Sequence, residues 1–195
     1  MNRLLRVEAF DGHHCHIIAQ FSTPRHVTTV AINPSTLCER EVADHLNASF
    51  PSATLIKNYW LPAIGAELEI ASGHYTGAID LLQPAERYEM SSDGPLIPAY
   101  IRGRAYLRAK QPEAAATEFR KVLQHRGIVG NNPVGALAHL ELARALTASG
   151  ETSEARAKYQ EFLMLWKDAD REIPILREAR SELAKIGGAK SPETR

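Results

Sequence analysis

The chain has 195 residues, of which 44% are apolar, and this is enough for one packed domain. Its 23 basic and 23 acidic side chains cancel, so no net charge draws it toward nucleic acid or an anionic membrane. Two cysteines are too few for a disulfide framework, no apolar run is long enough for a membrane span, and the charged N-terminus lacks the apolar core of a signal peptide. We expect a cytoplasmic protein and leave its oligomeric state open.

Residues 1–32 have no clear hydrophobic period and are interpreted as an irregular segment or the remnant of a longer protein. Within them, Val27 and Val30 suggest a short extended or helical piece. The run from His13 to His16 holds three histidines and a cysteine, but consecutive residues cannot all converge on one ion. We therefore predict no metal and no other cofactor. A flexible polar terminus is the simpler interpretation.

Residues 33–188 are predicted to form a helical repeat domain. Apolar residues at helical intervals between Pro34 and Pro51 indicate a half repeat over 33–51. Three helical hairpins follow, and then a capping helix that begins at a proline and ends before two glycines. The hairpins cover 58–88, 98–124 and 134–163, the capping helix covers 174–186, and a disordered tail covers 189–195.

One spacing recurs in all three hairpins. A small residue in the first helix is followed by a second position three residues on, an alanine nine beyond that and a bulky apolar residue four further. Small side chains let two antiparallel helices cross closely, and large ones beside them fill the groove. The series are Ala66, Glu69, Ala78 and Leu82; Gly103, Tyr106, Ala115 and Phe119; and Ala143, Leu146, Ala155 and Tyr159.

The equivalent small residues are 37 and then 40 residues apart. A tetratricopeptide unit has about 34 residues, so we place the excess in loops at 90–95 and 127–133. The second loop is interpreted either as a structural extension of the connection or as a functional loop.

Several short stretches are more specific than this repeat pattern. They are Asn58–Pro62, His125–Val129, Asn132–Pro133 with Gly135–Leu140, Leu165–Asp170 and Ile173–Leu176. In these residues the segment from about 58 to 186 resembles the C-terminal tetratricopeptide region of bacterial eukaryote-like serine/threonine protein kinases. A similar region also follows winged-helix DNA-binding domains in some regulators. The predicted fold is an all-α, right-handed superhelical stack of tetratricopeptide-like hairpins with a C-terminal capping helix.

No catalytic activity is predicted. A kinase needs a glycine-rich loop, a strand lysine and two catalytic aspartates in order, and Val30-Ala31-Ile32 is followed by Asn33 where the lysine would stand. Motifs of serine hydrolases, zinc proteases and dinucleotide-binding enzymes are also missing from the sequence.

Two arginines are the first candidates for partner binding. Arg104 follows Gly103 directly, and Arg144 follows Ala143 directly, so they occupy equivalent positions in successive hairpins. In tetratricopeptide proteins the first helices line the concave face, where peptide ligands usually lie. We therefore expect both arginines side by side on that face.

Tyr100 and Arg108 extend this row by one helical turn on either side of Arg104. Such a row would bind a carboxylate or an acidic segment through forked hydrogen bonds. The alternative is that the arginines pair within the chain, with Glu67 and Glu141, because charged helix faces often have only a structural role.

Two further features bear on partners. Trp60 and Trp166 are either exposed binding anchors or fillers of the seams between hairpins. Residues 60–94 carry a net charge of minus five and residues 98–126 a net charge of plus five. This contrast either fixes the stacking of the hairpins or orients a bound peptide.

We predict a scaffold that binds a protein or peptide partner on the concave face of its repeats, as a docking or sensory module linked to signalling. The candidate residues are Trp60, Glu67, Tyr100, Arg104, Arg108 and Arg144. One alternative is the detached regulatory region of a serine/threonine kinase or a winged-helix regulator. Another is a nucleic-acid-binding module, which the neutral total charge disfavours.

Overall fold

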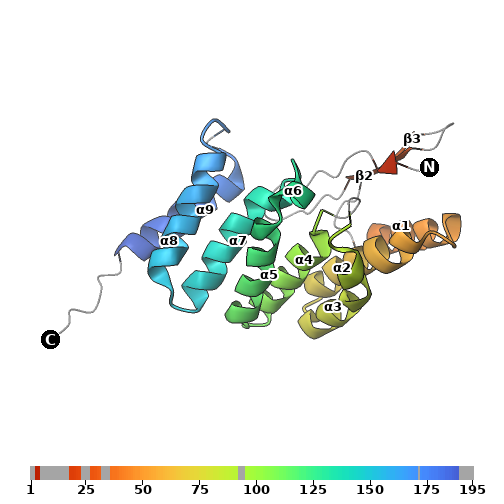
Figure 1. Ribbon diagram of the computed structural model, residues 1–195, viewed down its shortest axis with the longest axis horizontal. Coiled ribbons are helices and arrows are strands. Elements are labelled where there is room, and N and C mark those ends of the chain that lie inside the picture. The colour runs from red at the N-terminus through yellow and green to blue at the C-terminus, as the bar shows by residue number, and fades with distance from the viewer. Residues whose placement is uncertain are drawn as a thin grey trace.

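Helical hairpins stand in a row along the long axis of the molecule in the computed structural model (Figure 1). The structure describes the backbone of residues 3–4, 18–22, 27–31, 36–91, 95–170 and 172–188, and the side chains of 43–91, 95–170 and 172–186. The expected class, a stack of helical repeats, is confirmed. Neighbouring hairpins pack directly on one another, mainly through α5 on α7 and through α3 and α2 on α4.

The three hairpins are formed by α2 with α3, α4 with α5, and α7 with α8, while α1 and α9 stand at the two ends of the row. A π-helical turn leads into α2, and a 3-10 helix continues α3. The bounds are α1 Thr36–Ser49, η1 Ile56–Trp60, α2 Leu61–Ala71, α3 Tyr75–Leu81, η2 Gln83–Tyr88, α4 Ile97–Arg108, α5 Pro112–Gln124, α6 Arg126–Val129, α7 Val134–Ala148, α8 Thr152–Leu165 and α9 Pro174–Gly188.

The same turn closes each hairpin. One residue takes a left-handed backbone conformation, and the N–H of the next residue donates to a carbonyl five positions earlier, which is the Schellman arrangement. Gly73 and Gly150 adopt φ values of 81° and 85° at this position. Lys110 holds the same position with φ 59°, which the sequence did not indicate because lysine lacks the freedom of glycine. The three bonds run from His74 to Glu69, from Gln111 to Tyr106 and from Glu151 to Leu146.

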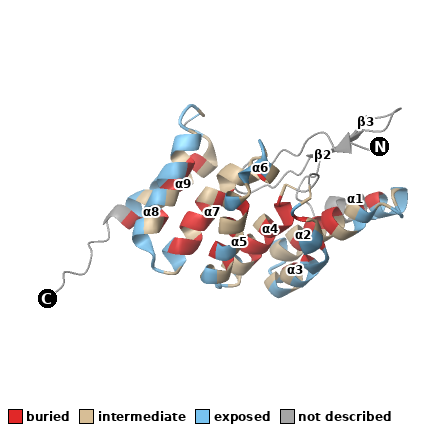
Figure 2. Cartoon of the chain, in the orientation of Figure 1, coloured by how far each residue is buried: buried red, intermediate tan, exposed pale blue. Residues whose placement is uncertain are grey.

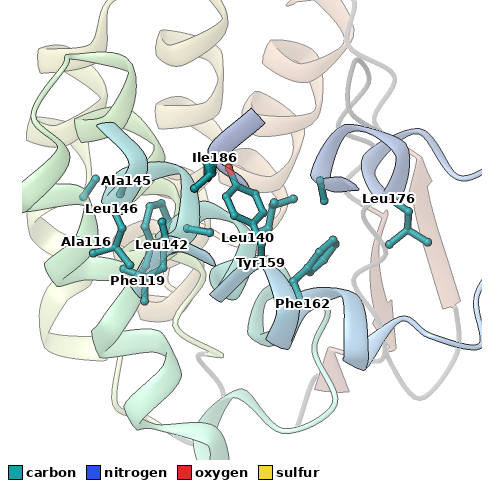
Figure 3. Close-up of a cluster of buried hydrophobic side chains, with 14 residues drawn as sticks. Ala116, Phe119, Leu140, Leu142, Ala145, Leu146, Tyr159, Phe162, Leu176 and Ile186 are labelled. Atoms are coloured by element: carbon teal, nitrogen blue, oxygen red, sulfur yellow. The ribbon is translucent and has the colours of Figure 1, made fainter. Parts of the chain in front are cut away.

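The core lies between the two helices of each hairpin and continues from one hairpin to the next (Figure 2). The small and bulky residues of the recurring series meet there, and all of them are buried. A Cβ atom added at Gly103 would lie only 2.7 Å from Cε1 of Phe119, so any larger residue at this crossing would require the ring to shift. Figure 3 shows Phe119, Leu142, Tyr159 and Leu176 within one apolar cluster that joins α5, α7, α8 and α9.

The connection after α5 is ordered by apolar packing. It contains the short helix α6, whose Val129 is 4% exposed and contacts Leu96, Val122 and Ala138 of the flanking helices. This packing favours the interpretation of the loop as a structural extension of the connection. Gly130, with φ 57°, makes the turn that follows.

The N-terminal segment contains three short strands, β1 Arg3–Leu4, β2 Ile18–Ser22 and β3 Val27–Ala31. They form an antiparallel sheet in the order β1-β2-β3. The sequence did not predict this sheet. It indicated either an extended or a helical piece at Val27 and Val30, and the extended conformation is observed. The histidine cluster at 13–16 and the tail at 189–195 lie outside the described residues.

Candidate functional site

The first helices of the hairpins form one layer, because α2 packs on α4 and α4 packs on α7. Glu67, Arg104 and Arg144 stand at the same position of these helices, directly after Ala66, Gly103 and Ala143. We call the surface formed by this row the first-helix face.

Arg104 is paired within the chain. Its Nη1 donates to Oε1 of Glu67 on the neighbouring helix, and the two side chains are 21% and 15% exposed. The guanidinium also lies over the ring of Tyr100, with its Cζ 5.9 Å from the ring centre. Arg104 therefore joins the first two hairpins and holds the Tyr100 ring beneath it.

Arg144 is surrounded by three carboxylates. It donates to Glu141 on its own helix at 2.9 Å, to both oxygens of Glu182 on α9 at 3.0 and 2.9 Å, and to Glu178 at 3.2 Å. Burial would lower the pKa of Arg144, but these hydrogen bonds and charges raise it above its ordinary value. The guanidinium is therefore always charged, and its donors are used inside the chain.

The hydroxyl of Tyr159 completes this cluster from the second helix of the third hairpin. It donates to Oε2 of Glu182 at 2.8 Å, and burial followed by the nearby Glu182 raises the pKa of this hydroxyl. The Arg144 cluster thus fastens the capping helix α9 to both helices of the third hairpin.

One turn beyond this row, a second set of equivalent residues is exposed. Ala71, Arg108 and Ala148 each lie five residues after the small residue of their hairpin, and all three are exposed. Arg108 has no ion pair or hydrogen bond to another side chain among the described residues. It is thus the candidate cation whose charge is open to a partner.

Trp60 is not an exposed anchor. It is 8% exposed, lies edge-on to Tyr59 with ring centres 5.0 Å apart, and packs in the core that reaches Ile97 of the second hairpin. Trp60 therefore agrees with the second interpretation of the tryptophans, in which the ring fills a seam between hairpins. Trp166 is half-buried against Phe162 at a ring distance of 5.9 Å.

The opposite charges of the first two hairpins meet in a buried network that the sequence analysis did not identify. Nη2 of Arg102 lies 3.0 Å from Glu89 and 2.8 Å from Glu118, and Lys121 donates to the other oxygen of Glu89. Glu86 lies 3.5 Å from Nη1 of the same arginine. Glu89 is fully buried and Arg102 is 3% exposed.

Burial alone would lower the pKa of Arg102, but its hydrogen bond to Glu118 and the charges of Glu118, Glu89 and Glu86 raise it. An alignment of the hairpins could have identified this network. Arg102 stands where the third hairpin has the buried Leu142, so a cation occupies a core position.

Ion pairing also reduces the basic field of the second hairpin. Four of its six bases, Arg102, Arg104, Arg120 and Lys121, are paired with acids of neighbouring hairpins or of its own helices. Less positive charge is then available to the phosphates that a nucleic-acid-binding module would contact.

The described residues contain no group of three or more metal-ligating side chains. Of the helices in the described ranges, none combines the length and the apolar character that a membrane crossing requires.

A family model for the tetratricopeptide repeat matches residues 65–127 and 100–171, and together these matches cover more than half of the chain. A comparison with curated proteins gives no significant match. Repeats of this type generally mediate protein–protein interaction. The relation to kinase-linked repeats, the signalling role and the cytoplasmic location stay predictions. The matched residues and the stack of hairpins agree: the chain belongs to the tetratricopeptide repeat family.

Proposed function

We propose that the chain holds a protein or peptide partner against the first-helix face, the surface of α2, α4 and α7 that carries Glu67, Arg104 and Arg144. The observation that carries this proposal is the exposed row of Ala71, Arg108 and Ala148, which repeats at one position in all three hairpins. A row with one member per hairpin offers an extended ligand three equivalent points of contact.

Intramolecular pairing limits where an acidic partner could bind. Three glutamates already occupy the donors of Arg144, so a further carboxylate there would meet net negative charge. Arg108 is exposed and lies one turn from Arg104 and two turns from Tyr100. In our proposal a carboxylate of the partner therefore contacts Arg108, while the apolar part of the partner lies on the alanines of the row and on the edge of Tyr100.

Photo-crosslinking would test the face. A benzophenone amino acid is placed singly at Ala71, Arg108 and Ala148, and the full chain is expressed in its native host and irradiated. The matched controls are the exposed second-helix positions Thr76, Glu113 and Ser153, each two residues before the repeat alanine of its hairpin.

We expect one protein to be crosslinked from at least two of the three first-helix positions and from none of the controls. The Arg108→Glu variant, probed from position 148, should reduce this product. Crosslinks from the second-helix positions alone would contradict the assignment of the face. Equal yields from the native and Arg108→Glu chains would contradict the role of Arg108.

A further inference from the structure

A second surface of the first hairpin has the features of a docking groove. The open seam is the groove between α2 and α3, and it is lined by Pro62, Glu69, Gly77, Asp80, Leu81 and Pro84. Leu81 is 43% exposed, so its side chain is accessible to a partner in this groove. This seam runs between the two helices of the hairpin, so it is distinct from the first-helix face.

The second hairpin shows how such a seam is filled. Glu118 and Lys121 stand 37 residues after Leu81 and Pro84, so they occupy the equivalent positions. There the preceding segment inserts Glu89, which is fully buried and bonded by Arg102 and Lys121. A charged side chain from the previous unit thus closes the seam against charges of opposite sign.

The third hairpin repeats the arrangement with other residues. Lys158 and Glu161 hold the equivalent positions, and Oε2 of Glu161 lies 2.8 Å from Nδ1 of His139. The short helix α6 of the preceding segment contacts α7, the first helix of this hairpin. The preceding unit thus covers the seam of the second hairpin, and a close contact between the hairpin's own helices spans the seam of the third.

The seam of the first hairpin differs in charge. Its two acids, Glu69 and Asp80, have among the described residues only His74 as a basic partner, 3.1 Å from Glu69 and itself 70% exposed. Gly77 brings the backbone of α3 close to the Glu69 carboxylate, because an added Cβ would lie 3.2 Å from Oε2. The floor is apolar and its edges are acidic.

We propose that the open seam is a second docking site, which takes a partner segment with an aliphatic side chain beside a lysine or arginine. The aliphatic group covers Leu81, Pro62 and Pro84. The cation pairs with Glu69 and Asp80, as Glu89 pairs with Arg102 and Lys121 in the next hairpin, with the signs reversed. Charge complementarity selects a basic partner here.

The test uses the full chain and two fluorescent peptides, one of alternating leucine and lysine and one with glutamate in place of lysine. Binding is measured by fluorescence anisotropy, and the site is located from amide NMR shifts. The variants are Leu81→Ser and Asp80→Lys. The matched controls are Met164→Ser on α8, where Met164 is 67% exposed, and Asp168→Lys just after that helix. All four positions are exposed, so the variants should retain the helical circular dichroism of the native chain.

We expect the lysine peptide to bind more tightly than the glutamate peptide and to shift the amides of Gly77 and Leu81. Leu81→Ser should weaken binding by about tenfold, the effect of losing roughly half of a buried leucine contact. Asp80→Lys should weaken it by about the same factor, because it sets a base against the partner's cation, and the controls should not change it. Arg108→Glu should also leave this binding unchanged, which separates the seam from the first-helix face.

Four results would overturn the proposal. They are no binding of the lysine peptide, equal binding of both peptides, unchanged binding by the seam variants, and NMR contacts in the free chain that place its own residues 1–35 in the seam. None of them bears on the partner proposed for the first-helix face.

Discussion

The buried network around Arg102 allows a quantitative test of how the first two hairpins are joined. Arg102→Leu introduces the residue type that the third hairpin has at this position, where Leu142 is 1% exposed. The leucine fits the apolar surroundings, but it removes one of the two cations bonded to the buried carboxylate of Glu89. Breaking a buried ion pair from one side costs about 3–5 kcal/mol when the remaining charge is left alone, and we expect the lower end of this range because Glu89 keeps Lys121.

The reverse substitution should cost less. Glu89→Leu leaves Arg102 bonded to Glu118 at 2.8 Å, and Lys121, which is 32% exposed, can turn toward water. We expect a loss of about 1–3 kcal/mol. The double variant should be more stable than Arg102→Leu alone, because no fully buried charge then lacks its partner.

Urea unfolding followed by far-UV circular dichroism would measure these differences. A domain is stable by only about 5–15 kcal/mol, so the loss expected for Arg102→Leu is a large share of the total. The control is Arg156→Leu, an exposed position on α8 where the change should stay within about 0.5 kcal/mol. The reasoning is refuted if Arg102→Leu costs no more than Glu89→Leu, or if the two effects simply add in the double variant.

Two further predictions concern the helix crossings. Gly103→Ala should lower the urea midpoint, because the added Cβ would lie 2.7 Å from the buried ring of Phe119. This clash costs about 1–3 kcal/mol. The better helix propensity of alanine, about 1 kcal/mol, offsets only part of that cost. Adding Phe119→Leu, which copies the bulky residue of the first hairpin, should restore part of the loss, and strict additivity would contradict the clash. Burial, together with the charge of Lys158, lowers the pKa of His139 despite the adjacent Glu161. The unfolded chain therefore takes up this proton first, so stability should fall as the pH drops below about 6.5, and a His139→Gln variant with the same pH dependence would contradict this.

The helical stack followed from local signals that act within one hairpin. Small residues at one spacing predicted the close crossings, and a glycine after a serine is a local signal for two of the three turns, at Gly73 and Gly150. The turn at Lys110 was not predicted because a lysine rarely adopts a left-handed conformation, yet its φ here is 59°. The strands β2 and β3 were not recognised because the segments are short and their period is unclear.

The candidate site was harder to predict, since pairing between helices depends on side-chain reach. Sequence spacing placed Arg104 and Arg144 at equivalent positions, and the structure gives them different surroundings. Arg104 meets Glu67 of the preceding helix, whereas Arg144 turns toward Glu182 of the following one. An alignment of the hairpins does not show that the two arginines have different partners, because the capping helix lies outside the recurring series.

The opposite charges of neighbouring hairpins have a structural use that the apolar core cannot supply. The crossings of the three hairpins are built from similar small and bulky residues, so apolar packing alone distinguishes poorly between possible neighbours. Ion pairs differ at each junction: Arg102 and Arg104 bind acids of the first hairpin, Arg120 lies 3.3 Å from Glu154 of the third, and Arg144 binds the capping helix. Moving the first hairpin next to the capping helix would set Glu67 against Glu178 and Glu182, which now bind Arg144, and such contacts between like charges are unfavourable. Charge therefore favours the observed place of the first hairpin in the stack, and the exposed Arg108 and the acidic open seam are charged features that this internal pairing leaves to partners.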